Sequence, residues 1–168
     1  MNMHSAYPAP FDARALRDVL GRFATGVTVV TTCGDNAQPL GLAVNSFASV
    51  SLDPPEILWS IASQAPSRPA FETHGAFTVN IMPDDEKETV LRFAKPIEDK
   101  FEGVDWGRGW KGVPILENAL ATLECDVKDM IPCGDHHIVV GSVRAIDSRD
   151  GEPLVFFRGQ FTSLGAAL

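Results

Sequence analysis

Seven short segments rich in β-branched and other apolar residues recur along this chain of 168 residues, separated by turn residues such as Gly, Pro, Asn and Asp. Helical spacing of apolar residues occurs in only three places, after Asp12 and over 67–74 and 84–94. A parallel doubly wound sheet needs a helix of about 10–15 residues between nearly every pair of strands. The pattern therefore predicts a mainly β fold with a few short helices, in which an antiparallel sheet closes into a barrel. The predicted strands span 26–34, 40–47, 56–63, 76–82, 119–131, 136–147 and 153–164.

The length of the chain predicts one domain, since a chain of this size commonly buries a single sizeable core. Residues 1–11 lack periodicity and are expected to form a flexible N-terminal arm, and the domain is expected to span 12–168. Asp12 is placed to cap a helix whose apolar residues, including Leu16 and Phe23, fall at helical spacing.

The balance of charge limits the partners that this chain is expected to bind. Its formal net charge is -8, from 14 Lys and Arg against 22 Asp and Glu, which disfavours nucleic acid and anionic membranes. The sequence contains no run of about 18 apolar residues, as a membrane helix requires, and its first residues lack the basic start and apolar centre of a secretion signal. We therefore expect a cytoplasmic protein without nucleic-acid or membrane partners.

The three cysteines give little sign of a metal site or a disulfide framework. Cys33, Cys125 and Cys133 form no C-x-x-C pair and are odd in number. We expect them to be buried, reduced thiols.

One apparent nucleotide-binding motif is rejected by its context. Residues 107–112 read GRGWKG, a formal match to the G-x-G-x-x-G pattern, which binds a pyrophosphate where it follows a strand and opens a helix. Here Val113-Pro114 follows, and proline confines the residue before it to extended conformations. The match predicts a glycine-rich loop, not a dinucleotide site.

A polar stretch between two predicted strands is more informative. Residues 44–55 read VNSFASVSLDPP, with an amide and three hydroxyls, and a second polar cluster follows with Ser63, Ser67 and Arg68. Small residues let backbone groups approach a flat ring, and hydroxyls and positive charge suit a phosphate. Composition alone favours the simpler interpretation that these serines occupy turns and helix caps.

The order of the motifs favours the ligand-binding interpretation. RFATGVTVVTT, GLAVNSFASVSLDPP, SRPAF, FTVNIM, LRFA with DKF, and GDHHIVVGSV follow one another from about Arg22 to Phe161. In this order they resemble the short-chain flavin reductase family, the NAD(P)H:flavin oxidoreductases of two-component flavin-dependent monooxygenases. The resemblance implies a Greek-key split β-barrel, a homodimer, FMN or FAD as flavin, NADH or NADPH as hydride donor, and a partner monooxygenase that receives reduced flavin.

The resemblance also implies roles for individual residues. His136 is expected to act at the nicotinamide, although a solvent-facing histidine at the start of a strand is the simpler interpretation, and His137 is expected to point to the opposite face. Two departures from the family pattern, the ASQAPS loop with Gln64 and Ala65 and Phe161 in place of a tyrosine, leave those positions without an assigned role. The expected isoalloxazine-binding residues are Ala43, Val44, Asn45, Ser46, Ser49, Val50 and Ser51, and the expected phosphate-binding residues are Ser63, Ser67 and Arg68. The residues expected to close the flavin site are Phe93, Lys100 and Phe101. Those expected at the nicotinamide nucleotide are His136, Phe157, Arg158 and Gly159.

Hydride transfer between a nicotinamide and a flavin requires no side-chain nucleophile, which agrees with a sequence that has no Ser-His-Asp constellation. Two alternatives stay open. One is a flavin-bound reductase of a cobalt corrinoid or a ferric complex, and the other is a non-catalytic FMN-binding carrier or sensor.

Overall fold

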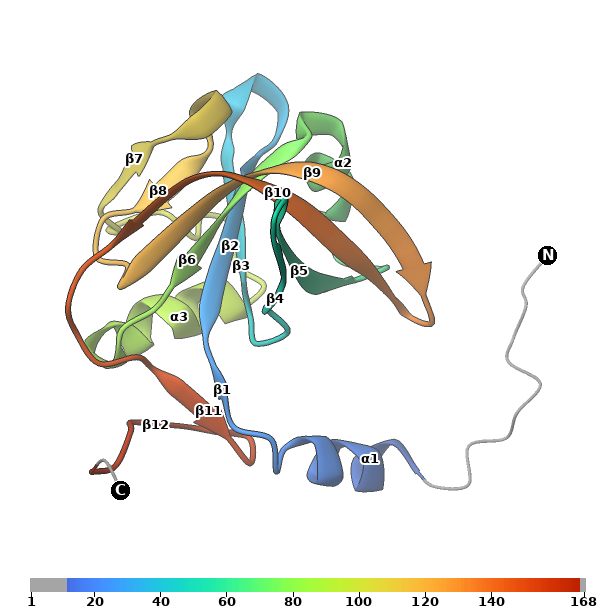
Figure 1. The fold of residues 1–168 in the computed structure, drawn as a ribbon, viewed down its shortest axis with the longest axis vertical. Helices are drawn as coiled ribbons and strands as arrows, with labels where there is room; N and C mark the ends of the chain where they lie inside the picture. The colour runs from blue at the N-terminus through green and yellow to red at the C-terminus, as the bar shows by residue number, and fades with distance from the viewer. Residues whose placement is uncertain (1–11, 167–168) are drawn as a thin grey trace.

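The computed structural model describes residues 12–166, so the arm expected at residues 1–11 lies outside the described residues. Figure 1 shows the arrangement of the elements. The helices are α1 (Ala13–Leu20), α2 (Arg68–His74) and α3 (Lys87–Ala94), with 3-10 turns η1 (Asp35–Ala37), η2 (Asp84–Glu86) and η3 (Trp110–Gly112). The strands are β1 (Thr25–Gly26), β2 (Thr28–Cys33), β3 (Pro39–Val44), β4 (Ala48–Leu52), β5 (Pro55–Ala62), β6 (Ala76–Ile81), β7 (Trp106–Arg108), β8 (Pro114–Leu116), β9 (Ala121–Cys133), β10 (His136–Ser148), β11 (Val155–Phe157) and β12 (Gln160–Thr162).

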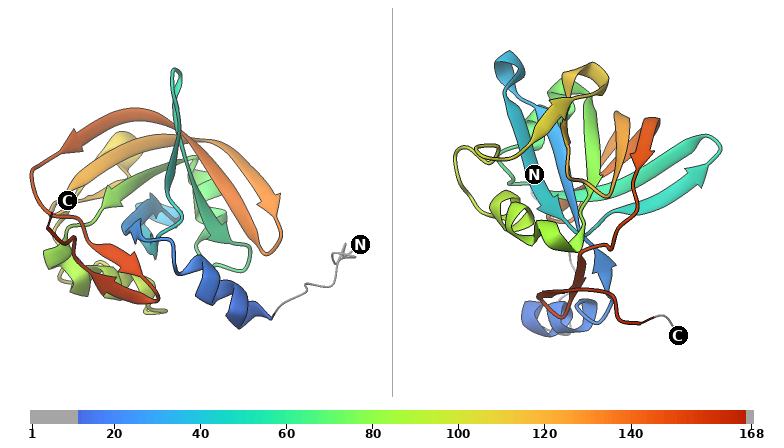
Figure 2. Two further views of the ribbon diagram at one scale, coloured as in Figure 1. Left: turned by 60° about the horizontal axis from the view of Figure 1, so that its bottom comes forward. Right: turned by 90° about the vertical axis from the view of Figure 1, so that its left-hand side faces the viewer.

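Seven strands form one antiparallel sheet in the order β3-β2-β6-β9-β10-β5-β4. The long strands β9 and β10 arch across the other elements (Figure 2). The prediction of a mainly β, antiparallel fold with few helices is confirmed. Over residues 12–166 the sheet is open, because its two edge strands β3 and β4 do not pair with each other.

The strand β2 shows why a threonine-rich segment lies at the centre of this fold. All six of its residues are buried. The Thr31 hydroxyl donates to the main-chain oxygen of Pro114 at 2.5 Å, and the Thr32 hydroxyl donates to that of Ala76 at 2.8 Å. Buried hydroxyls are tolerated where they are hydrogen-bonded, so β-branched threonines serve here as core residues.

Two clusters of buried apolar side chains pack on the sheet. The first includes Phe93 of α3 and Met82, and the second includes Phe71 of α2 and Trp59. The Trp59 ring meets Phe71 edge to face, with the ring centroids 4.9 Å apart. The short helices α2 and α3 thus each contribute an aromatic anchor to the core.

Two strand predictions need correction. The segment 44–55 contains β4, which was not predicted and which forms a hairpin with β5. The segment predicted as one strand over 153–164 is a hairpin of β11 and β12. Its turn residues Arg158 and Gly159 have φ values of 52° and 78°, as a two-residue hairpin turn requires.

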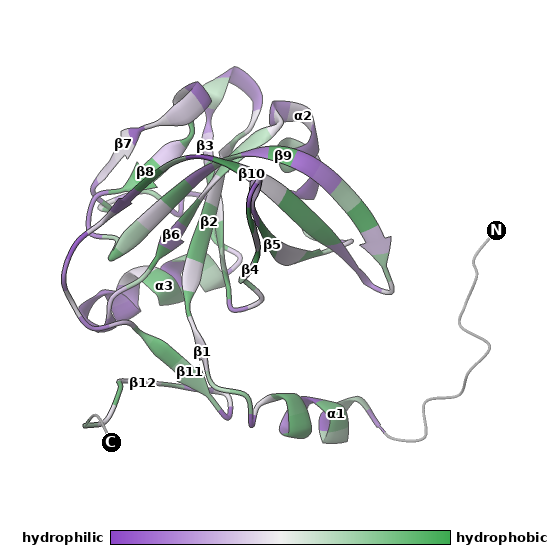
Figure 3. Cartoon of the chain, in the orientation of Figure 1, coloured by the Kyte–Doolittle hydropathy of each residue, from purple (hydrophilic) through white to green (hydrophobic). Residues whose placement is uncertain are grey.

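The helix α1 begins as predicted but is not buried. The Asp12 carboxylate caps it, accepting a hydrogen bond from the Ala15 main-chain nitrogen at 2.7 Å. None of its residues is buried, and Val19 and Leu20 at its end and Phe23 just beyond it are exposed. Figure 3 shows the hydrophobic segments of α1. Among the described residues no helix has the length and apolar character needed to cross a bilayer.

The GRGWKG segment is a loop only in its later part, because Gly107 and Arg108 belong to β7. A single 3-10 turn and then β8 follow its start, so no α-helix is available there for a pyrophosphate. The loop is attached to β9, where the Asp126 carboxylate accepts a hydrogen bond from Trp110 Nε1 at 2.9 Å and pairs with Lys111 Nζ at 2.8 Å. Arg144 Nε of β10 donates to the same carboxylate at 2.7 Å.

These donors make Asp126 a test of pH-dependent stability. The hydrogen bonds from Lys111 and Trp110 lower the pKa of Asp126 to about 2. Because this folded-state pKa lies below the unfolded value of about 4, the contribution to stability is present above pH 4 and is lost as pH falls toward 2. We expect Asp126→Asn to lower the free energy of unfolding at pH 7 by about 1 kcal/mol, allowing for solvent screening.

Urea unfolding at pH 7 and near pH 2 measures this effect, with Asp129→Asn on the same strand as the control. A deficit for Asp126→Asn that stays the same at both pH values contradicts the assignment.

Candidate functional site

A cavity of about 730 Å³ opens between the free edge of β3 and the segment after α3. Its volume falls within the range of about 300–1,000 Å³ typical of small-molecule sites. The cavity is lined by Pro39, Leu40, Gly41, Leu42, Ala43, Ala65, Pro66, Ser67, Phe93, Ala94, Lys95, Pro96, Ile97, Glu98, Lys100 and Phe101.

The first wall is β3, whose alternation places small residues toward α3. Ala43 packs against the cluster that contains Phe93, whereas Leu42 packs against the other cluster. A Cβ on Gly41 would lie 2.8 Å from the Phe93 ring. Gly41 therefore lets the strand and the Phe93 ring pack in direct contact.

The edge position of β3 adds a second property to this wall. The strand pairs only with β2, so one row of its main-chain N–H and C=O groups faces away from the sheet. Within the described part of the chain these groups have no backbone partner outside the β2 pairing. The wall offers main-chain donors and acceptors to a ligand at the cavity.

The second wall is the segment 95–101, which we call the wall segment. The Phe101 ring meets Phe93 edge to face at 5.0 Å between centroids, and meets Trp106 at 5.4 Å. This aromatic stack fixes the inner end of the wall segment against the core.

Lys100 contributes a positive charge to the cavity. Its Nζ donates to the main-chain oxygen of Phe93 at 2.9 Å and forms no ion pair with any residue of 12–166. Burial lowers the pKa of this amine. Lys100 is therefore a partly desolvated cation with capacity for an anionic partner.

The structure brings together only part of the predicted flavin-binding set. Five members line the cavity: Ala43, Ser67, Phe93, Lys100 and Phe101. Val44 and Asn45 directly follow Ala43, but Ser46 is turned toward β5, where its Oγ accepts a hydrogen bond from the Ser60 main-chain nitrogen at 2.9 Å. Ser49, Val50 and Ser51 lie on β4, at the other edge of the sheet, and do not line the cavity.

The predicted phosphate-binding residues cluster at the start of α2. Arg68 Nε donates to the main-chain oxygen of Ser63 at 3.2 Å, and its Nη1 pairs with Glu72 at 3.3 Å. The Ser63 hydroxyl lies 3.1 Å from His137 Nδ1. Ser67 lines the cavity at the N-cap of α2, and its side chain makes no capping hydrogen bond.

The predicted nicotinamide-binding residues lie outside the cavity lining. His136 begins β10, and its Nδ1 lies 2.7 Å from the Asp135 carboxylate. The β11–β12 hairpin contains Phe157, Arg158 and Gly159. The guanidinium carbon of Arg158 lies 5.9 Å from the centroid of the Phe157 ring.

The cysteines differ from the expectation at one position. Cys33 and Cys125 are buried free thiols, and burial raises the pKa of Cys125 to about 12. Cys133 is exposed at the end of β9, so the prediction that it is buried is wrong.

The family model for the flavin reductase like domain matches residues 20–165 of this sequence. The chain belongs to this family. The resemblance to flavin reductases stated from the sequence motifs is thereby confirmed.

Relatives agree with this membership. The flavin-dependent monooxygenase reductase subunit HsaB of Rhodococcus jostii is 40% identical over 154 residues, covering 91% of this chain and 78% of the relative. The FMN reductase (NADH) SmoA of Agrobacterium fabrum is 41% identical, covering 95% and 91%. In another curated relative the chain spans only 49% of the length.

A solved structure supports the fold. The Streptomyces globisporus NADH:FAD oxidoreductase SgcE6, in complex with NAD and FAD fragments, superposes with a TM-score of 0.88 at 34% identity, covering 96% of this chain and 98% of that one.

The cavity residues fit a flavin. A flat ring needs a wall without large side chains, which Gly41 and Ala43 provide on the free edge of β3. An anionic group needs a cation and hydroxyls, which Lys100 and Ser67 provide. Gly41 and the apolar wall residues Pro96 and Ile97 were missed by sequence reasoning, although Gly41 lies within the GLAV motif.

Proposed function

We propose that this flavin reductase binds FMN or FAD in the cavity between β3 and the wall segment, takes hydride from NADH or NADPH, and supplies reduced flavin to a partner flavin-dependent monooxygenase. The observation that carries the proposal is the combination of the free edge of β3, its small residues and the cation of Lys100 in one cavity. The relatives named as reductase subunits support the partner assignment.

Each wall has a distinct role in this proposal. When bound, the flavin supplies the electron acceptor for the hydride. The main chain of β3 binds the edge of the ring system, and Gly41 and Ala43 allow the close approach. Lys100 neutralises negative charge on the flavin, and Ser67 binds its phosphate. Phe93 and Phe101 exclude water from one side of the cavity.

The proposal retains the split β-barrel, the single domain and the homodimer. Strong curvature of the sheet around its open edges supports a split barrel (Figure 2). The exposed apolar residues Val19 and Leu20 of α1, and Phe23 just after it, support a second copy of the chain as their partner.

His136 is the proposed contact with the nicotinamide nucleotide. We expect His136→Ala to raise the KM for NADH about tenfold, the effect of one lost contact of about 1.4 kcal/mol, while the affinity for flavin stays unchanged. Steady-state kinetics with NADH as the varied substrate measure this.

His137→Ala is the neighbouring control for the NADH KM. His137 contacts Ser63, so its replacement is expected to act on flavin binding if it acts at all. Equal and small effects of the two substitutions on the NADH KM count against the role of His136.

One experiment tests the proposed function directly. Purified protein is mixed with NADH or NADPH, with and without FMN, FAD or riboflavin, and the loss of nicotinamide absorbance is followed. Turnover with added flavin alone supports the proposal. Turnover that needs an added cobalt corrinoid or ferric complex, or tight flavin binding without nicotinamide oxidation, overturns it.

A further inference from the structure

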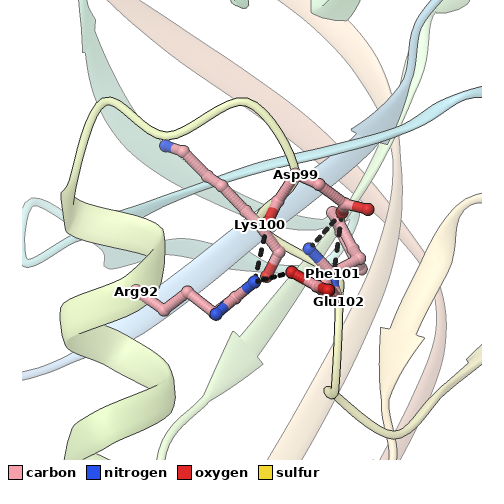
Figure 4. A network of polar contacts seen from close by, with 5 residues as sticks. All are labelled: Arg92, Asp99, Lys100, Phe101 and Glu102. Atoms are coloured by element: carbon pink, nitrogen blue, oxygen red, sulfur yellow. Dashed lines mark hydrogen bonds and ion pairs between the residues drawn. The ribbon is translucent and has the colours of Figure 1, made fainter.

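Arg92, on the last turn of α3, does not line the cavity but attaches the wall segment to the helix (Figure 4). Its Nε donates to the main-chain oxygen of Lys100 at 2.9 Å, and its Nη2 donates to that of Asp99 at 2.9 Å. The same Nη2 lies 3.4 Å from the Glu102 carboxylate. The guanidinium therefore contacts three residues of the short stretch 99–102, namely Asp99, Lys100 and Glu102.

The wall segment has its own turn at this point. The Asp99 carboxylate accepts hydrogen bonds from the main-chain nitrogens of Phe101 at 3.0 Å and Glu102 at 3.1 Å. This turn leaves the Asp99 and Lys100 carbonyls directed at Arg92. An arginine fork suits two neighbouring acceptors, since its donors are held in a fixed plane.

Two hydrogen bonds of opposite direction join α3 and the wall segment. Arg92 of α3 holds the main chain of Lys100, and the Lys100 side chain returns to the main-chain oxygen of Phe93 on α3. The positions of the Lys100 amine and of the Phe101 ring at the cavity thus depend on Arg92, which binds the main chain of Lys100 from α3.

We propose that Arg92 is a positioning residue for flavin binding, which acts by fixing the main chain at 99–100 so that Lys100 and Phe101 form the second wall of the cavity. This inference rests on the proposed flavin site. It assigns a share of the affinity for flavin to an arginine that contacts a wall residue, Lys100, but does not itself line the cavity.

The chain offers a matched control in Arg149. Its Nε donates to the main-chain oxygen of Ala119 at 3.0 Å and its Nη2 to that of Asn118 at 2.8 Å, the same pair of bonds at a loop that does not line this cavity. Arg92→Met and Arg149→Met therefore remove the same chemistry from two different loops.

The experiment measures the Kd for FMN by fluorescence titration without nicotinamide, and hydrogen–deuterium exchange of the apoprotein. We expect Arg92→Met to raise the Kd about tenfold, equivalent to one charged hydrogen bond, and to speed exchange at 99–102, whereas Arg149→Met keeps the wild-type Kd. Arg92→Lys retains the charge but not the two-pronged donor geometry of the guanidinium, and its Kd is expected to lie between those of wild type and Arg92→Met. If Arg92→Met does not fold, Arg92→Lys replaces it in the comparison. Equal Kd values for Arg92→Met and wild type, or equal losses for the two methionine variants, overturn the inference.

A double-mutant cycle with Lys100→Met separates this inference from the proposed site. If Arg92 acts through Lys100, its replacement has a smaller effect in the Lys100→Met background than in the wild type. If Lys100→Met raises the Kd and the effect of Arg92→Met adds to it in full, the positioning role is contradicted and the proposed flavin site is not. An unchanged Kd for Lys100→Met contradicts the proposed flavin site, and the positioning role with it.

Discussion

Replacing Gly41 with alanine is expected to weaken flavin binding more than tenfold and to destabilise the fold. The added Cβ would lie 2.8 Å from Cε1 and 3.0 Å from Cδ1 of the Phe93 ring. The ring is 1% exposed, so it has little room to move away. Overpacking of this kind costs about 1–3 kcal/mol, and any displacement of Phe93 moves one wall of the cavity.

Thermal unfolding and flavin titration of Gly41→Ala measure the two effects. Gly26→Ala is the control, because a Cβ there has no neighbour within 4 Å and the residue also lies on a strand. A Gly41→Ala protein that binds flavin as tightly as wild type shows that the cavity is not the flavin site or that Phe93 does not shape it.

Replacing Lys100 with methionine is expected to raise the Kd for FMN by about tenfold or more, the cost of losing a charge-assisted contact with an anion. Methionine keeps an apolar chain of similar length and removes the charge together with the hydrogen bond to the main-chain oxygen of Phe93. Because burial lowers the pKa of Lys100, the wild-type affinity is expected to fall as pH rises into the alkaline range, earlier than for an ordinary lysine.

Titrations of wild type, Lys100→Met and Lys100→Arg across this pH range measure the prediction. Lys87→Met, at the start of the same helix α3 and outside the cavity, controls for the loss of net charge. Lys100→Arg is expected to retain most of the affinity without the alkaline loss. A pH profile that is the same in wild type and Lys100→Met argues against a role for this amine.

Sequence reasoning located most strands because their signal is local. A buried strand such as β2 needs β-branched residues whatever its neighbours are, so TVVTTC is readable alone. The hairpin at 155–162 was missed because Arg158, a residue that rarely adopts positive φ, occupies the turn beside Gly159.

The structure brings together only part of the predicted site. The order of motifs indicated a flavin reductase, and five of the residues named from it line one cavity. Ser46 was expected at the ring, but its hydroxyl bonds to the main chain of Ser60. A serine in a polar stretch looks the same in sequence whether it binds a ligand or a neighbouring strand, because the difference lies in which strand packs beside it.

The sequence by itself determined the family and most strands of the main sheet, since strand propensity, turn residues and ordered motifs are properties of consecutive residues. Only the tertiary structure decided that Gly41 faces Phe93, that Ser63 meets His137, and that Arg92 holds the chain at Lys100. The first two contacts join residues about 50 or more positions apart, and the third depends on how a loop folds back on its helix. Such contacts follow from packing and hydrogen-bond geometry in three dimensions, which no local pattern encodes.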